Sequence, residues 1–442
     1  MKKIVAKFGG SSLASAKQFQ KVKDIIEADE ARCYIVVSAP GKRHAEDSKI
    51  TDILLMCHQL AAHHLSFDEI FAKAAERFRS IVKELELPTD IDGILKEVYI
   101  KIENGASREY CASRGEYINA RLLADYLSYP FVDAGELIRF ERADRLDEEQ
   151  TRTAIQKRLQ DSPRAVIPGF YGTGPNGEVL CFSRGGSDVT GALLADACQA
   201  DLYENWTDVS GFLMTDPAIV PDAMPMEQLT FTELRELSYM GARVMHEEAI
   251  FPLRRRGIPV RIRNTDHPEA FGTLITPEPD ASDRTGLITG LSGKKDFTVF
   301  TVEKLRMAED PSFFRKLLSV FESNDVPVAH MPSAIDSISV IAEDRFINGK
   351  AKKILEEIRI YCAPDAIELV HGIAMVAVVG RGMIHTKGIS ARVFAALADN
   401  DINVRIISQG SSEITIMIGV ENSDFEKAVA AIYYAFAERI NS

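Results

Sequence analysis

The sequence predicts an α/β protein in which a mostly parallel central sheet lies between helices and is followed by two smaller modules. Over roughly the first 280 residues, short apolar runs alternate with segments of helical apolar spacing. Most of these runs are continuously apolar, which is typical of strands buried on both faces of a parallel sheet. After a Pro- and Asp-containing stretch at residues 276–283, which we interpret as a linker, the pattern changes to βαββα and then repeats.

We expect three domains, at residues 1–285, 286–370 and 371–442. In the first, strands are expected at residues 4–7, 33–38, 131–134, 165–169, 179–182, 202–207 and 258–262. Helices are expected between them, at residues 15–28, 51–64, 113–127, 188–200 and 231–240. In the two modules, strands are expected at residues 297–303, 337–342, 373–380, 403–408 and 414–419, and helices at residues 311–324, 347–360, 388–400 and 423–436.

Composition and charge restrict the class of protein. The chain has 442 residues, 46% of them hydrophobic and 26% charged, which is the balance of a soluble globular protein. A net charge of −13 argues against a nucleic acid or an anionic membrane as a partner. The N-terminal apolar run is too short for a signal peptide, and no run approaches the ~20 residues of a membrane span. Because the six cysteines form no C-x-x-C pair, we expect a cytoplasmic protein in reducing surroundings.

The most informative motif follows the first expected strand. Lys7 is followed by Phe and then by Gly9, Gly10, Ser11 and Ser12, before a helical segment. Adjacent glycines let backbone N–H groups converge on one point, serines add hydroxyl donors, and a helix N-terminus favours an anion. With the Lys7 ammonium beside it, this turn is a candidate phosphate cradle. The alternative is an ordinary turn with a helix cap, because the motif is neither a Walker A loop nor a Gly-x-Gly-x-x-Gly loop.

A second glycine turn has the same plan. It lies between the strand expected at residues 179–182 and the helix expected at residues 188–200, and it contains Arg184, Gly185, Gly186, Ser187 and Asp188. The arginine side chain can bind a carboxylate or phosphate in bidentate fashion. Asp188 alone is explained as a first-turn charge that interacts with the helix dipole, worth about 0.3–1 kcal/mol. Two such turns facing one sheet edge favour a cleft for phosphate transfer.

A third motif reads Ser-Arg-Gly-Glu at residues 113–116, before an apolar run. It predicts a capping box with Ser113 as the N-cap residue and Glu116 at the third helical position. That role is compatible with the Glu116 carboxylate also binding a ligand ammonium. The charged stretch at residues 42–49 is either a mobile lid over a substrate or a solvated insertion.

Together and in this order, the motifs resemble those of the aspartate kinases. Lys-Phe-Gly-Gly-Ser-Ser at residues 7–12 is similar to the opening signature of that family, and Ser-Arg-Gly-Glu is similar to its Ser-x-Gly-Glu. The combination with Gly-Gly-Ser-Asp at residues 185–188 distinguishes the chain from carbamate, acetylglutamate and uridylate kinases. The resemblance implies an amino acid kinase fold followed by two ferredoxin-like βαββαβ ACT modules. Further matches are Ser38 in a Val-Ser-Ala turn, Thr51 at a helix start, Thr207-Asp208 in Thr-Asp-Val-x-Gly, and Arg243-Val244 in Gly-Ala-Arg-Val-x-His.

The resemblance implies that the γ-phosphoryl group of Mg-ATP is transferred to the side-chain carboxylate of L-aspartate, the first step toward lysine, threonine and methionine. Lys7 is expected to bridge the β- and γ-phosphates, and Asp188 to orient Lys7 or help position Mg²⁺. Arg184 is expected to clamp a carboxylate of aspartate and Glu116 to hold its ammonium. Further substrate contacts are expected from Ser38, Thr51, Gly185, Gly186 and Ser187. Further nucleotide contacts are expected from Gly9, Gly10, Ser11, Thr207, Asp208, Arg243 and Val244.

The modules imply feedback regulation by an amino acid such as lysine or threonine, and a homodimer or higher homo-oligomer. Where better-known members carry a tyrosine and an arginine near the nucleotide, this chain has Leu213 and Ala218. Residues 327–329 read Pro-Val-Ala and lack the acidic residue of lysine-regulated members, which argues against lysine as the effector. The length leaves no room for a fused homoserine dehydrogenase. Two alternatives remain, namely a kinase for another amino acid such as glutamate and a non-catalytic amino-acid sensor.

Overall fold

The structure is a computed structural model that describes residues 2–437, apart from residues 144, 184, 243, 244, 246 and 278–285. The chain forms two compact units. The first comprises residues 1–212, 225–231 and 244–281, and the second comprises residues 213–224, 232–243 and 282–442. Within the described residues, no helix has both the length and the apolar character needed to cross a bilayer.

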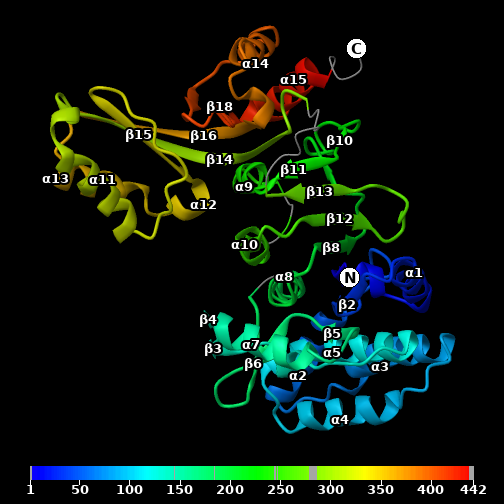
Figure 1. The fold of residues 1–442 in the computed structure, drawn as a ribbon. Coiled ribbons are helices and arrows are strands. Elements are labelled where there is room, and N and C mark those ends of the chain that lie inside the picture. Colours follow the sequence, from blue (N-terminus) through cyan, green and yellow to red (C-terminus); the bar gives the residue numbers. More distant parts are fainter. Residues whose placement is uncertain are drawn as a thin grey trace. The chain divides into compact units, whose positions relative to one another are not determined.

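The first unit is built on a seven-stranded sheet of order β11–β13–β12–β8–β1–β2–β5 (Figure 1). The five strands from β12 to β5 are parallel, whereas β13 is antiparallel to β12 and parallel to β11. This confirms the expected mostly parallel sheet. The strands are β1 (Ile4–Phe8), β2 (Arg32–Val37), β5 (Ala165–Pro168), β8 (Leu202–Thr207), β11 (Gln228–Thr230), β12 (Val260–Asn264) and β13 (Thr273–Thr276).

Helices cover the sheet. Because successive side chains of β1 point to opposite faces, the two faces of the strand contact different helices. Ala6 and Phe8 belong to a hydrophobic core shared with helices α1 to α5, whereas Lys7 points to the opposite face, on which α8 packs. Each helix buries an apolar stripe of 3.6-residue period. The helices are α1 (Ala16–Glu27), α2 (Ile50–Ala62), α3 (Asp68–Glu84), α4 (Ile91–Glu103), α5 (Arg108–Leu127), α6 (Ala134–Leu137), α7 (Glu148–Leu159), α8 (Gly186–Cys198) and α10 (Glu247–Arg256), with a 3-10 turn η1 at Ser11–Leu13. Helix α9 (Phe231–Tyr239) belongs, from residue 232 on, to the second unit.

Two expected strands differ from the structure. The strand expected at residues 179–182 is β7, which pairs with β6 as an antiparallel hairpin closed by a turn with Gly177 at φ 83°. The strand expected at residues 131–134 is only an isolated bridge from Phe131 to Val166, because Asp133 caps α6 immediately afterwards. The remaining short strands are β3 (Phe140–Arg142), β4 (Arg145–Leu146), β6 (Tyr171–Thr173), β7 (Val179–Cys181), β9 (Phe212–Leu213) and β10 (Pro225–Met226).

The predicted capping box at residues 113–116 is wrong. Helix α5 begins at Arg108, and the Ser107 side chain accepts a hydrogen bond from the Tyr110 backbone N–H. Ser113 and Glu116 therefore lie inside the helix, where both are buried. Helices α6, α7 and α10 were not expected from the sequence. Neither were helices α3 and α4. Their apolar residues extend the core that α1, α2 and α5 form.

The second unit contains one five-stranded antiparallel sheet of order β15–β14–β16–β18–β17. Its helices gather at opposite ends of the sheet, α11 and α13 at one end and α14 and α15 at the other (Figure 1). The strands are β14 (Gly290–Glu303), β15 (Ser337–Glu343), β16 (Ala366–Val379), β17 (Ile406–Gln409) and β18 (Thr415–Glu421). The helices are α11 (Pro311–Ser323), α12 (Asp344–Ile347), α13 (Ala351–Cys362), α14 (Ile389–Ala398) and α15 (Phe425–Ala437), with 3-10 turns η2 (Met307–Glu309), η3 (Arg381–Met383) and η4 (Asn422–Asp424).

The two modules share their central strands. The register of β14 against β16 shifts between Lys294 and Phe297, which divides each long strand into two halves. One half of β14 pairs with β15, and the half of β16 beyond Ile373 pairs with β18. Residues 370 and 371, where we expected one module to end and the next to begin, lie within β16. The expected domain boundaries stay predictions.

Candidate active site

The centre of the site is a lysine held by two polar side chains from separate elements. Lys7 Nζ lies 2.7 Å from Asp188 Oδ1 and 3.3 Å from Asn205 Oδ1. Asn205 Nδ2 in turn donates to Asp188 Oδ1 at 3.1 Å. The side chains of Lys7 and Asp188 are only 10% and 18% exposed. The ammonium therefore has a fixed position and limited contact with solvent.

The secondary structure explains why these three residues meet. In the parallel pairing of β1 with β8, Lys7 stands directly opposite Asn205. Asp188 lies in the first turn of α8, where a carboxylate also interacts favourably with the helix dipole. The N-cap residue of this helix is Gly185, whose φ of 57° suits glycine. The strand pair and the helix start together form a three-residue cluster around one ammonium.

The first glycine turn lies against the end of β8. The Gly9 N–H donates to Trp206 O at 2.9 Å, and a Cβ on Gly9 would lie 3.8 Å from Lys7 Nζ. At Gly10 a Cβ would meet Ala39 O at 2.8 Å, so the close approach of two backbones requires glycine there. Ser11 begins the η1 turn, and α1 starts only at Ala16. Helix α1 thus agrees with the helix expected at residues 15–28, and the short η1 turn lies between it and the glycines.

The second glycine turn is packed as closely. A Cβ on Gly186 would meet Phe170 Cδ2 at 2.7 Å, and a Cβ on Gly169 would meet Ser187 Cβ at 2.6 Å. These contacts hold the start of α8 against the segment that follows β5. The turn follows the β6–β7 hairpin, and Arg184 lies outside the described residues.

A buried carboxylate on α5 faces the end of β2. Among the residues that the structure describes, Glu116 Oε2 and Asn119 Oδ1 have no hydrogen-bond donor. The Asn119 amide Nδ2 donates to Ser38 O at 2.7 Å, which ties α5 to the turn after β2. A Cβ on Gly115 would meet Ala39 Cβ at 2.7 Å, so this helix turn needs glycine to approach the loop. Burial raises the pKa of the Glu116 carboxyl to about 8.

The other expected site residues lie at element ends. Thr51 is half-buried in the first turn of α2. Thr207 ends β8, and its hydroxyl donates to Asp208 Oδ1 at 3.1 Å. Arg243 and Val244 lie outside the described residues.

The charged loop at residues 42–49 is anchored in this structure. Arg77 of α3 donates to Asp47 Oδ2 at 2.7 Å and to Gly41 O at 2.8 Å, and its side chain is only 3% exposed. Arg43 also bonds Asp47, and its hydrogen bond holds the pKa of the Asp47 carboxyl well below its usual range. Two arginines, Arg43 and Arg77, thus form ion pairs with Asp47 of this loop.

Two polar residues of the site were not expected from the sequence, namely Asn205 and Asn119. Glu204 and Asn205 together interrupt the apolar run of β8, and that interruption was an available signal. Asn119 stands one helical turn after Glu116, on the same face of α5. Among the described residues, no group of three or more His, Cys, Asp or Glu side chains is arranged to hold a metal ion.

The fold and this site define the class of protein. A parallel α/β sheet carries a lysine fixed by a carboxylate, with glycine turns packed at strand and helix ends. That arrangement suits transfer of a phosphoryl group between small molecules. The family model described as "Amino acid kinase family" matches residues 2–264, and the model described as "ACT domain" matches residues 376–436.

Similarity to known proteins narrows the class to one family. The chain is 35% identical to aspartokinase 3 of Bacillus subtilis, over 98% of each chain. It is 31% identical to chloroplastic aspartokinase 1 of Arabidopsis thaliana, over 98% of this chain and 80% of that one. The solved structure of Clostridium acetobutylicum aspartate kinase superposes with a TM-score of 0.87 at 49% identity, covering 99% of this chain and 100% of that chain. The chain belongs to the aspartokinases, which phosphorylate aspartate, and it carries the ACT modules expected from the sequence.

Proposed function

We propose that this aspartokinase transfers the γ-phosphoryl group of Mg-ATP to the side-chain carboxylate of L-aspartate, giving 4-phospho-L-aspartate, with Lys7 as the catalytic cation. The observation that carries this assignment is the Lys7 ammonium, fixed 2.7 Å from Asp188 beside the first glycine turn. Phosphoryl transfer depends mainly on positioning and on neutralising charge. A lysine already in place stabilises the charge that develops on the β- and γ-phosphates without further rearrangement.

In this proposal the neighbouring residues divide the work by chemistry. Asp188 and Asn205 position Lys7, while the backbone of the two glycine turns cradles phosphates. Mg²⁺ bound with the nucleotide would neutralise phosphate charge. The aspartate carboxylate, with a pKa of about 3.9, is already ionised at neutral pH and attacks without a general base. Further nucleotide contacts are assigned to Ser11, Thr207, Asp208, Arg243 and Val244.

The aspartate pocket in this proposal lies between the end of β2 and helix α5. Glu116 binds the substrate ammonium and Arg184 clamps a carboxylate, with Ser38 and Thr51 completing the pocket. Because the pKa of Glu116 is raised to about 8, the free enzyme holds this carboxyl mainly protonated at pH 7. The incoming ammonium then replaces that proton.

The test traps the acyl phosphate with hydroxylamine in the presence of Mg-ATP, comparing L-aspartate with L-glutamate. Hydroxamate from aspartate alone is the expected result. Product from glutamate in preference would assign a different acceptor. Absence of product with both acids, from folded protein that binds ATP, would favour the sensor alternative.

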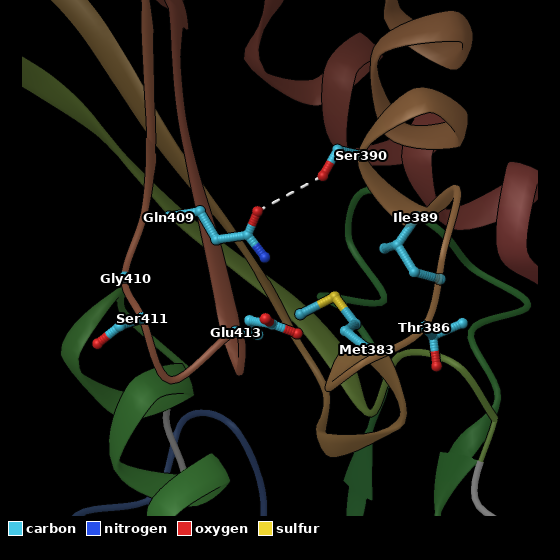
Figure 2. Close-up of a pocket in the computed structure, with 8 residues that line it drawn as sticks. All are labelled: Met383, Thr386, Ile389, Ser390, Gln409, Gly410, Ser411 and Glu413. Atoms are coloured by element: carbon cyan, nitrogen blue, oxygen red, sulfur yellow. Dashed lines mark hydrogen bonds between the residues drawn. The ribbon is translucent and has the colours of Figure 1, made fainter.

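The second module offers a site for an amino-acid effector. A cavity of about 390 Å³ lies between the loop before α14 and the end of β17. Figure 2 shows Glu413, Gln409 and Ser390 around it, with Met383 and Ile389 supplying apolar surface. A carboxylate beside amide and hydroxyl groups is suited to a ligand that carries both an ammonium and a carboxylate.

We assign feedback regulation to an amino acid such as lysine or threonine, and Pro-Val-Ala at residues 327–329 of the first module argues against lysine. We also place the enzyme in the cytoplasm as a homodimer or higher homo-oligomer. Adding lysine, threonine or methionine to the hydroxylamine assay tests the effector. Inhibition by lysine alone would contradict the argument against lysine, and light scattering of the full chain measures the oligomeric state.

A further inference from the structure

Two buried oxygen atoms on one face of α5 call for a donor. Within the described part of the chain, Glu116 Oε2 and Asn119 Oδ1 receive no hydrogen bond, although the residues are only 6% and 0% exposed. They stand three residues apart, a spacing that places side chains next to each other on a helix surface. An unsatisfied buried polar atom costs about 1–3 kcal/mol. A pair of them on one face indicates a site completed by a molecule that donates hydrogen bonds.

The remaining polar atoms of both side chains are already committed to the end of β2. Asn119 Nδ2 donates to Ser38 O at 2.7 Å, and the Ala39 backbone hydrogen-bonds the Glu116 carboxylate. Because a carbonyl oxygen only accepts, the amide of Asn119 cannot be flipped without losing its bond to Ser38. Oδ1 therefore stays an acceptor, and the backbone of residues 38 and 39 fixes both side chains in place.

We propose that Asn119 Oδ1 and Glu116 Oε2 jointly accept the ammonium of the substrate, which makes Asn119 a specificity-determining residue. This inference rests on the proposed function, which assigns the ammonium to Glu116 alone. An ammonium has three N–H donors and no acceptor, so it matches a site that, once the Glu116 carboxyl has released its proton, presents two oxygens and no free donor. Glu116 supplies the charge, and Asn119 supplies a direction that a single carboxylate cannot impose.

The same arrangement explains how the enzyme distinguishes amino acids from simple dicarboxylates. A ligand without the ammonium leaves both oxygens buried without a partner. Sites built around a hydrogen bond reject analogues that lack it far more strongly than apolar pockets reject a missing methylene. Succinate keeps both carboxylates of aspartate and lacks only the ammonium, so it is the appropriate probe.

Calorimetry on the full chain, with aspartate and succinate as ligands, tests the proposal. The quantity measured is the ratio of the two dissociation constants. Asn119→Leu is expected to reduce the preference for aspartate about tenfold or more, because a hydrogen bond to a charged group is worth about 1.5–3 kcal/mol. Asn119→Asp keeps an acceptor at the Oδ1 position and, when protonated, a donor to Ser38 O. Asn119→Asp is therefore expected to retain the preference for aspartate over succinate. It also allows the test to be made if the leucine variant does not fold.

The matched control is Asn324→Leu in the second unit. Asn324 is also buried, but its amide donates to Val320 O and Glu357, so its loss changes stability and not the ligand ratio. An equal loss of affinity for both ligands in Asn119→Leu would mean that the amide only holds the loop at Ser38, which overturns the inference. An unchanged ratio also overturns it. If wild-type protein forms no hydroxamate from aspartate, the proposed function itself fails, which is a separate result.

Discussion

The two halves of the site differ in how their charges are satisfied before any substrate binds. On the phosphate side, Lys7, Asp188 and Asn205 satisfy one another within 3.3 Å. On the ammonium side, Glu116 and Asn119 each keep a buried oxygen for which the described residues provide no donor. The first half is assembled in advance, whereas in our proposal the second half is completed by its ligand.

This difference matches what each half has to do. A catalytic cation accelerates the reaction only if it is already in place when charge develops, so its partners must be internal. A specificity site discriminates better when the wrong ligand leaves buried polar atoms unpaired. The cost of unsatisfied atoms in the free enzyme is thereby turned into selectivity for an ammonium.

The largest expected effect comes from removing the preassembled cation. Lys7→Ala should lower kcat by about 100- to 1,000-fold, the range for loss of one charge-stabilising donor, and should change the KM for aspartate far less. Steady-state kinetics with Mg-ATP measures both constants. The matched control is Lys21→Ala, which removes another lysine–aspartate pair of 2.6 Å that is exposed to solvent. A wild-type-like kcat in Lys7→Ala would end the assignment of Lys7.

The next effect concerns the stability cost of the unsatisfied carboxyl. The pKa of Glu116 is about 8 in the folded protein and near 4.5 when the group is free. Between these values the folded state holds a proton that the unfolded state releases, so stability falls as pH rises and levels off above pH 8. Glu116→Gln removes this loss, so its stability relative to wild type should increase by about 1.4 kcal/mol for each pH unit between pH 4.5 and 8.

Chemical denaturation of both proteins across that pH range measures the difference. Glu233→Gln is the matched control, because Glu233 is equally buried but bonds Arg381 Nη1 at 2.8 Å and Thr289. Breaking a paired buried carboxylate destabilises, so the control should change in the opposite direction. If Glu116→Gln is destabilised like Glu233→Gln at pH 7, then the Glu116 carboxyl is satisfied and the contrast between the two halves is wrong.

A smaller effect is expected in the pH dependence of catalysis. Only ionised Glu116 pairs with an ammonium, so kcat/KM for aspartate should rise by up to about tenfold per pH unit below pH 8 and then level off. The same ratio for ATP should change less, because Glu116 is assigned to the aspartate pocket. Initial rates from pH 6 to 9 measure the profile. A profile for aspartate that is flat below pH 8 contradicts a raised pKa in the free enzyme.

Local motifs in the sequence were sufficient for the residues that stand at strand and helix ends. Asp188 was expected to orient Lys7, and the structure brings the two side chains into contact. Asn205 was missed because its meeting with Lys7 depends on the register of β1 against β8, which a single sequence does not specify. Asn119 was missed because a polar residue on an amphipathic helix is ordinary until the packing of its face is known.

The wrong cap at Ser113 has a comparable cause. Ser107 and Ser113 both satisfy the local pattern for an N-cap residue, and only tertiary packing selects between them. The helix continues through residues 108–113 because the core that holds α3 and α4 extends over its first turns, and those helices were not expected. The strand at residues 179–182 was placed in the main sheet because its apolar run does not encode its partner. A turn of Pro-Asn-Gly at residues 175–177 was the missed sign of a hairpin.

The smallest expected effect is that of removing Asn205, the uncharged residue of the cluster with Lys7 and Asp188. Asn205→Leu removes one acceptor from Lys7 and one donor to Asp188, while the 2.7 Å ion pair remains. One hydrogen bond has a net value of about 0.5–1.5 kcal/mol, so kcat should fall roughly 3- to 10-fold with little change in the KM for aspartate. Asn205→Asp should lower kcat further than Asn205→Leu, because it places a second carboxylate beside Asp188. If Asn205→Leu matches Lys7→Ala in kcat, the amide and not the carboxylate positions the ammonium, and the two halves of the site would depend on asparagine alike.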